Sequence, residues 1–353
     1  MTFRRTRPRP DFRLAGALLA LFVGAGCDSD TTAPPNGDRA EVAVILNSIE
    51  RSLTVVPVDS PDGAFTIGIA PDGSPVNLAT RDGIVIVPLG TVPAAVVVDL
   101  ALATVVHTVP LAAGSGATGA AFLNDSIALV GNPAPNTVSP INVLRGTRGE
   151  DVAVGAYPHA IVAVNDTAYV LNAQLGPDFQ PAGPGTISVI TGSPPTVVAT
   201  IALEGVNPGA AAVGNDAVYV LHAGHFGMND GSLSIVDRST LAETSHVTGF
   251  GDFPGSIVQA PDGQLVVAAF SYGLAVWDPG TGEFTNPPAS PIHPGGVASI
   301  AGIGFDAEDR LYALEPNCTG PGSALRLDAA FEVEIEIETG ICPVAVVFTE
   351  LGT

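Results

Sequence analysis

The sequence of 353 residues predicts an all-β fold: a seven-bladed β-propeller of four-stranded antiparallel blades, with the ring closed by N- and C-terminal strands. Three observations lead to this prediction. A turn–strand–turn–strand unit recurs at spacings of 41 to 50 residues, the period of a propeller blade. Glycine (41 residues) and proline (31 residues) separate short apolar runs, which is typical of many strands joined by turns. The units supply seven inner strands when both chain ends are counted.

The recurring unit is clearest at residues 207–221, Asn-Pro-Gly-Ala-Ala-Ala-Val-Gly-Asn-Asp-Ala-Val-Tyr-Val-Leu. It reads as a turn, a strand of small residues that we name A, a tight turn, and a strand B of large apolar residues. Small side chains suit A strands because these strands crowd around the axis of a ring. The predicted A strands are 76–80, 118–122, 160–164, 209–213, 256–260, 297–305 and 344–348. The predicted B strands are 84–88, 127–130, 168–171, 218–221, 265–268 and 311–314, with a seventh at 42–47.

Aspartate marks the predicted turns, where its side chain can accept hydrogen bonds from its own backbone. One series stands between strands A and B: Asp82, Asp125, Asp166, Asp216, Asp262 and Asp309. Two more apolar runs, C and D, follow each B strand, and a second series separates them: Asp59, Asp99, Asp237, Asp278 and Asp328. Each unit therefore has four strands. The chain begins at a B strand and ends at an A strand, so pairing the two ends would remove a free sheet edge.

The repeats resemble a known family. Residues 214–221 (Gly-Asn-Asp-Ala-Val-Tyr-Val-Leu) and 196–203 (Thr-Val-Val-Ala-Thr-Ile-Ala-Leu) are similar to YVTN-type β-propeller repeats. The resemblance covers about residues 41–350. It is strongest in the units around Ala160 and Gly209 and weakest in the unit around Thr118, whose turn lacks proline. It implies a propeller and names no ligand.

The N-terminus predicts export. The arginines that form its charged region are Arg4, Arg5, Arg7, Arg9 and Arg13, and an apolar run at 14–23 follows them. The next residues, Gly24-Ala25-Gly26-Cys27, resemble the lipobox of bacterial lipoproteins, with Gly24 where leucine is usual. The resemblance implies a lipoprotein signal peptide at 1–26 and a lipid on Cys27. An ordinary signal peptide cleaved nearby is the alternative.

The remaining chain is expected to form a flexible tether at 27–40 and the propeller domain at 41–353. We expect the protein at the cell envelope, periplasmic or on the cell surface. Its contact with the membrane would be through the N-terminal lipid only.

The charge excludes some functions. The net charge is −22, and all 13 basic residues are arginine. Removal of residues 1–26 would leave a net charge of −26, which repels phosphate backbones and excludes nucleic acid as a partner. The absence of lysine excludes a lysine nucleophile. The acidity suits either solubility, as an expected monomer, or a cation-rich surrounding. The alternating acidic segment 332–338 suits either a solvated edge strand or a calcium site.

Antiparallel strands place the connections on two faces of the ring. We call the face with the D–A and B–C connections the loop face, and the face with the A–B and C–D connections the turn face. The long connections 173–185 and 222–231 belong to the loop face, where function usually sits. Cys318 and Cys342 fall on the same face in adjacent blades, so outside the cytoplasm they are predicted to form a disulfide that does not involve Cys27.

Candidate ligand residues gather on the predicted loop face: His159, His222, His225, Asp230, His293 and Glu315. Neutral imidazoles beside carboxylates suit a divalent cation, so a metal is possible there, although no cofactor is expected from any motif. Histidines scattered over loops without a chemical role are the alternative, because the spacing matches no metal motif.

Two functions follow from these residues. The first is an envelope-tethered binding or protein-interaction scaffold with an unknown ligand, favoured because no catalytic motif is present. The second is a hydrolase or lyase that uses histidine and carboxylate groups at the channel mouth. It would resemble seven-bladed lactonases and streptogramin lyases in architecture alone. The two hypotheses differ in whether His159, His222 and Glu315 meet within a few Å at the channel mouth.

Overall fold

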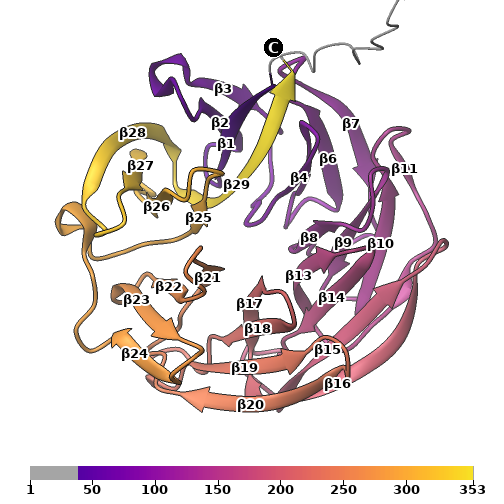
Figure 1. Ribbon diagram of the computed structural model, residues 1–353. Coiled ribbons are helices and arrows are strands. Elements are labelled where there is room, and N and C mark those ends of the chain that lie inside the picture. The colour runs from indigo at the N-terminus through magenta and orange to yellow at the C-terminus, as the bar shows by residue number, and fades with distance from the viewer. Residues whose placement is uncertain (1–38, 353) are drawn as a thin grey trace, which may run out of the picture. The chain divides into compact units, whose positions relative to one another are not determined.

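A ring of seven antiparallel β-sheets forms the part of the chain that this computed structural model describes, residues 39–352 (Figure 1). The predicted fold class, a seven-bladed propeller of four-stranded blades, is confirmed. The predicted signal peptide, Cys27 and nearly all of the tether lie outside the described residues. The helices within residues 39–352 are two 3-10 turns, Pro61–Gly63 and Pro294–Gly296, and neither is long or apolar enough to cross a membrane.

The blades are numbered in chain order, and each runs from an inner strand A to an outer strand D. Blade 1 is β4 (Ala79–Arg81), β5 (Ile84–Pro88), β6 (Ala94–Asp99) and β7 (Thr104–Pro110). Blade 2 is β8 (Ala120–Phe122), β9 (Ile127–Asn132), β10 (Thr137–Asn142), β11 (Thr147–Arg148) and β12 (Val152–Ala153). Blade 3 is β13 (Pro158–Val164), β14 (Thr167–Asn172), β15 (Pro184–Thr191) and β16 (Thr196–Val206).

The second half of the ring follows the same order. Blade 4 is β17 (Pro208–Val213), β18 (Ala217–His222), β19 (Ser232–Asp237) and β20 (Ala242–Thr248). Blade 5 is β21 (Ser256–Gln259), β22 (Leu265–Ala269), β23 (Gly273–Asp278) and β24 (Glu283–Asn286). Blade 6 is β25 (Ile303–Phe305), β26 (Leu311–Glu315), β27 (Pro321–Leu327) and β28 (Val333–Ile341). Blade 7 is β29 (Pro343–Gly352), β1 (Arg39–Asn47), β2 (Ser52–Pro57) and β3 (Phe65–Gly68).

The two ends of the described chain close the ring in blade 7. Strands β1 and β29 pair antiparallel, from Arg39 opposite Gly352 to Asn47 opposite Pro343. In Figure 1 the indigo and yellow strands lie side by side at this point. The predicted closure by N- and C-terminal strands is therefore confirmed.

Blades 2 and 6 depart from the prediction in detail. The outer strand of blade 2 is broken into β11 and β12, which both pair with β10. Pro140, in the middle of β10, has no N–H to donate, and its carbonyl accepts from Gly149 in the bulge between the two pieces. In blade 6 the inner strand begins only at Ile303, whereas the predicted segment began at residue 297; the 3-10 turn Pro294–Gly296 ends directly before that segment.

The core lies between neighbouring blades. One cluster joins Val44 and Val55 of blade 7 to Val85 and Val96 of blade 1, and equivalent clusters recur around the ring. The predicted aspartate turns also form. Asp237 accepts hydrogen bonds from the hydroxyl of Ser239 and from the backbone and hydroxyl of Thr240, and these bonds lower its pKa to about 2. The blades therefore form a stiff frame that fixes the ends of its connecting loops.

Candidate functional site

The loop-face half of the central channel is a cavity of about 320 Å³ lined mainly by inner strands. In five blades an inner strand is introduced by proline, and the residue after that proline lines the cavity: Val76, His159, Gly209, Gly255 and Val344. His159 is the one titratable side chain in the lining. The other positions hold small or aliphatic residues, so a single histidine interrupts an apolar ring.

A backbone irregularity directs His159 to the channel. The β13–β14 pairing skips one residue between Pro158 and Ala160, and the β17–β18 pairing skips Gly209 in the same way. Nδ1 of His159 is buried and has no hydrogen-bond partner within residues 39–352. Burial lowers the pKa of His159, so the imidazole is neutral at neutral pH. His159 therefore lies at the loop-face mouth of the channel.

His222 lies inside blade 4, one strand away from the axis. It is fully buried, and its Nε2 is 2.6 Å from Oγ of Ser234 on the neighbouring strand. The His246 ring lies edge-on to it at 5.9 Å. Burial first, and the proximity of His246 second, lower the pKa of His222 to about 3. This side chain is a neutral hydrogen-bonding group of the blade and does not reach the cavity.

The position of His222 is a repeated structural one, the last residue of a B strand. Asparagine holds it in three other blades and donates to two hydroxyls of strand C. The donors are Asn47 to Ser52 and Thr54, Asn132 to Thr137 and Ser139, and Asn172 to Thr186 and Ser188. Glu315 ends strand B of blade 6 and lies opposite Ser323. Alignment of the B-strand ends would have shown this equivalence in the sequence.

His225 and Asp230 bond to each other across their own loop. Nδ1 of His225 is 2.7 Å from Oδ2 of Asp230, and the backbone N–H of His225 donates to Oδ1 at 2.7 Å. Partial burial alone would raise the pKa of Asp230, but the hydrogen bonds from His225 hold it below its ordinary value. His293 donates from Nε2 to the carbonyl oxygen of Tyr272 at 2.8 Å.

The predicted residues therefore do not gather at one point. His225 and Asp230 meet, whereas His159 is the member of the set that lines the channel cavity. Within residues 39–352 no three His, Cys, Asp or Glu side chains are placed to hold a metal ion together. A divalent cation at this face stays a prediction.

Exposed aromatic side chains on the loop face are the feature that the sequence analysis missed. Phe179 is 66% exposed, Phe226 77% and Phe270 56%, and each stands in a B–C connection. Phe179 and Phe226 form edge-on pairs with aromatic side chains of neighbouring connections. The rings of Tyr157 and Phe179 lie 6.2 Å apart at 85°, and those of Phe226 and Phe253 lie 5.5 Å apart at 79°. In the sequence, these aromatic residues could have been noticed as isolated apolar residues within polar loops.

Basic residues lie mostly on the other side of the ring. Of the eight arginines in residues 39–352, Arg51 stands in a loop-face connection. The others lie in turn-face connections or at strand ends that meet that face: Arg39, Arg81, Arg145, Arg148, Arg238, Arg310 and Arg326. The carboxylates in or next to loop-face connections are Glu50, Asp72, Asp178, Asp230, Asp252 and Glu315. The loop face is therefore acidic as well as aromatic.

The predicted disulfide braces this face beside the ring closure. Cys318, in the B–C connection of blade 6, is bonded to Cys342, in the connection into β29, with the Cα atoms 4.2 Å apart. The backbone N–H of Cys342 also donates to the carbonyl of Asn317 at 2.8 Å. The pairing of Cys318 with Cys342 is confirmed.

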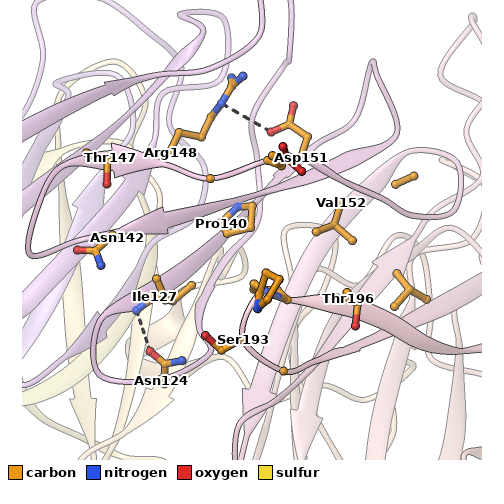
Figure 2. A pocket seen from close by; sticks show the side chains of 17 residues that line it. Asn124, Ile127, Pro140, Asn142, Thr147, Arg148, Asp151, Val152, Ser193 and Thr196 are labelled. Atoms are coloured by element: carbon orange, nitrogen blue, oxygen red, sulfur yellow. Dashed lines mark hydrogen bonds and ion pairs between the residues drawn. The ribbon is translucent and has the colours of Figure 1, made fainter.

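A second cavity, of about 670 Å³, lies between the broken outer strand of blade 2 and the C–D turn of blade 3 (Figure 2). Two of its three charged side chains are paired with each other: Arg148 Nε is 3.7 Å from Asp151, which also accepts from the Ser139 hydroxyl at 2.7 Å. Asn124 accepts from the N–H of Ile127. These contacts explain the irregular strand, and we therefore place the candidate site on the loop face.

Comparisons with known proteins support the fold. No family model matches the chain, and no curated protein matches it. Several solved structures do. Hydrazine synthase of Kuenenia stuttgartiensis is 14% identical over 81% of this chain and 97% of its own, with a TM-score of 0.63. A functionally unknown protein of Desulfotomaculum acetoxidans is 12% identical over 87% and 98%, with a TM-score of 0.65. Apo AztD of Citrobacter koseri is 15% identical over 90% and 100%, with a TM-score of 0.54. At these identities the likeness concerns the fold alone.

Proposed function

We propose that this protein is a binding scaffold, held at the cell envelope by a lipid on Cys27, and that its loop face is the surface that holds the partner. The tether rests on the lipobox-like residues 24–27 and on the polar segment that follows them. A rigid ring at the end of a flexible tether presents one face while it remains free to turn. The YVTN-type repeats fit the same role, because they supply a frame and no catalytic motif.

The observation that carries the proposal is the convergence of exposed aromatic side chains on the loop face. Single exposed apolar side chains are normal on a surface, whereas apolar side chains that gather on one face mark an interaction site. Aromatic side chains contribute much of the binding energy at protein interfaces. Four of the five exposed phenylalanines of residues 39–352 lie on this one face: Phe179, Phe226, Phe253 and Phe270. Tyr157, which pairs with Phe179, has its ring 6.4 Å from that of His159 in the cavity lining.

Photocross-linking in cells tests which face holds a partner. p-Benzoylphenylalanine replaces Phe179 in one strain and Leu144 in another. Both side chains are 66% exposed, and Leu144 lies in a C–D turn of the turn face. We expect discrete cross-linked species from position 179 and none from position 144. Adducts from both positions, or from neither, would refute the loop face as the binding surface.

The tether has its own test. Cys27→Ala should abolish incorporation of a clickable palmitate analogue and move the protein from the membrane fraction to the soluble fraction. Continued lipid labelling of this variant would contradict the assignment of Cys27.

A further inference from the structure

We propose that the loop face of blades 3 to 5 binds a basic protein segment, a stretch of chain that carries arginine or lysine side chains. The inference deepens the proposed function, on which it rests, by naming the class of partner. It follows from the chemistry of two aromatic pairs, from the distribution of charge over the ring, and from the backbone that holds the aromatic residues.

Each aromatic pair lies beside a carboxylate. Asp178 directly precedes Phe179, whose ring stands edge-on to Tyr157. Asp252 directly precedes Phe253, whose ring stands edge-on to Phe226. The electron-rich faces of such rings attract ammonium and guanidinium groups, and a carboxylate beside them can accept the N–H bonds of the same cation.

The second pair is held together by its own loop contacts. Oδ1 of Asp252 accepts from the N–H of Gly227 at 2.8 Å, which fixes the connection 249–255 against the B–C loop of blade 4. Asp230 in that loop is held by His225 and stays ionised, because the hydrogen bonds outweigh partial burial and lower its pKa. A cation at this pair would meet a preorganised, negatively charged surface.

The charge of the whole face favours a basic partner. Six carboxylates stand in or next to loop-face connections, and Arg51, whose Nε is buried, is the one arginine in them. The turn face is acidic as well, because the aspartates of its A–B and C–D turns outnumber the seven arginines there. The aromatic pairs are what distinguish the loop face of blades 3 to 5. A face of one sign attracts ligands of the opposite sign and orients them as they approach.

The backbone supplies an independent observation. Tyr157, Phe179 and Phe253 have φ of 56°, 60° and 51°, in the left-handed region that bulky L-residues rarely adopt. Asn207 takes the place of Tyr157 and Phe253 in the connection between blades 3 and 4, with φ of 55°. The turn therefore needs no aromatic ring. Strained residues that a fold does not require are characteristic of functional surfaces.

Fluorescence anisotropy with a labelled hepta-arginine peptide tests the inference, using the mature lipidated protein in nonionic detergent. The loop-face variant Phe179→Asn with Phe226→Ser removes one ring from each pair. We expect its affinity to fall about tenfold, as the loss of two exposed cation–π contacts implies. The matched control, Leu102→Asn with Leu144→Ser, changes two similarly exposed side chains of the turn face and should bind as the wild type does.

A second pair of variants isolates the charge. Asp178→Asn with Asp252→Asn should weaken peptide binding, whereas Asp62→Asn with Asp166→Asn on the turn face should not. Because Asn can still accept the bond from Gly227, the loop keeps its contact. Equal losses on both faces would show attraction to the protein's net charge alone and would overturn the inference.

Two further outcomes test whether the partner is basic. Unchanged binding by both loop-face variants would overturn the inference, and so would equal affinity for a hepta-glutamate peptide. If position 179 nevertheless cross-links to a partner in cells, the proposed function stands and the partner class alone is wrong. Circular dichroism of Phe226→Ser checks that this variant folds. Because Phe226 is 77% exposed, we expect the spectrum of the wild type, and a loss of binding is then not a loss of folding.

Discussion

His222 occupies, in blade 4, the place that a buried asparagine holds in three other blades. The asparagines donate to two hydroxyls of the next strand, and His222 makes the corresponding contact with Ser234. An imidazole can gain a proton where an amide cannot. The exchange therefore makes one blade sensitive to acid while it keeps one of the two hydroxyl contacts that asparagine makes.

His222→Asn should make the protein more resistant to acid. The pKa of His222 is about 3 in the folded protein and about 6.5 in an unfolded chain. The unfolded state thus binds the extra proton, and stability is lost as the pH falls from about 6.5 towards 3. At pH 5 the wild type should have lost about 2 kcal/mol that the variant retains. Urea denaturation at pH 7 and pH 5 measures the difference.

The reciprocal variant serves as the control for that prediction. Asn172→His places an imidazole at the same position of blade 3 and should introduce a comparable loss between pH 7 and pH 5. Parallel pH profiles for the wild type and His222→Asn would contradict the assignment of the acid sensitivity to His222.

His159 and His222 point in different directions, and the sequence pattern does not predict this difference. His159 and His222 both stand at the end of a predicted strand near the loop face. A one-residue bulge turns His159 into the channel, whereas regular pairing places His222 opposite Ser232 and beneath Ser234. Bulges and registers depend on the whole sheet, so the residue pattern predicted the face but could not separate these two roles.

At the scale of the element, inner strands and their turns were predictable because their signals are local. Small residues mark the A strands, and aspartate marks the A–B and C–D turns. The outer strand of blade 2 was not predictable in the same way. Its break follows from Pro140 in the neighbouring strand, a contact between segments that only the folded sheet brings together.

The loops were the least predictable elements. The connection 223–231 takes its shape from the bond between Asp252 and Gly227 and from the pair of His225 with Asp230. The first of these contacts joins residues 25 positions apart. The aromatic pairing on the loop face depends on such contacts and left no periodic pattern in the sequence.

Removal of the disulfide should weaken the two connections that it joins in blade 6. Cys318→Ser with Cys342→Ser releases a link between residues 24 positions apart, and the loss of that constraint on the unfolded chain should cost about 3 kcal/mol. Denaturant unfolding of the variant measures this loss, and chemical reduction of the wild type should reproduce it. Unchanged midpoints in both experiments would show that the bridge adds no stability.

At the scale of the molecule, ring closure joins the two ends of the described chain in one sheet. Val44 lies opposite Val347 and Ile45 opposite Val346, and the side chains of blade 7 complete the packing against blades 6 and 1. The pairing with β29 covers the edge that β1 would otherwise leave free. The closed ring fixes the ends of the loops that together form the loop face.

Deletion of residues 343–353 should open the ring and destabilise the protein severely. It removes all of β29, exposes the edge of β1, and uncovers apolar side chains such as Val44. Removal of residues 352–353 alone is the control and should have little effect. Thermal unfolding measures both. An unchanged midpoint after the long deletion would refute the closure as a source of stability.

We propose that the loop face serves binding, and this proposal requires that the fold does not need the aromatic side chains there. The free energy of unfolding of Phe179→Asn tests that claim most directly. Phe179 is 66% exposed at φ of 60°, so asparagine, which accepts this backbone region, should relieve strain while little burial is lost. We predict that urea denaturation gives a free energy of unfolding higher than that of the wild type by about 0.5 to 1 kcal/mol. A decrease would mean that Phe179 supports the fold, which would contradict the claim.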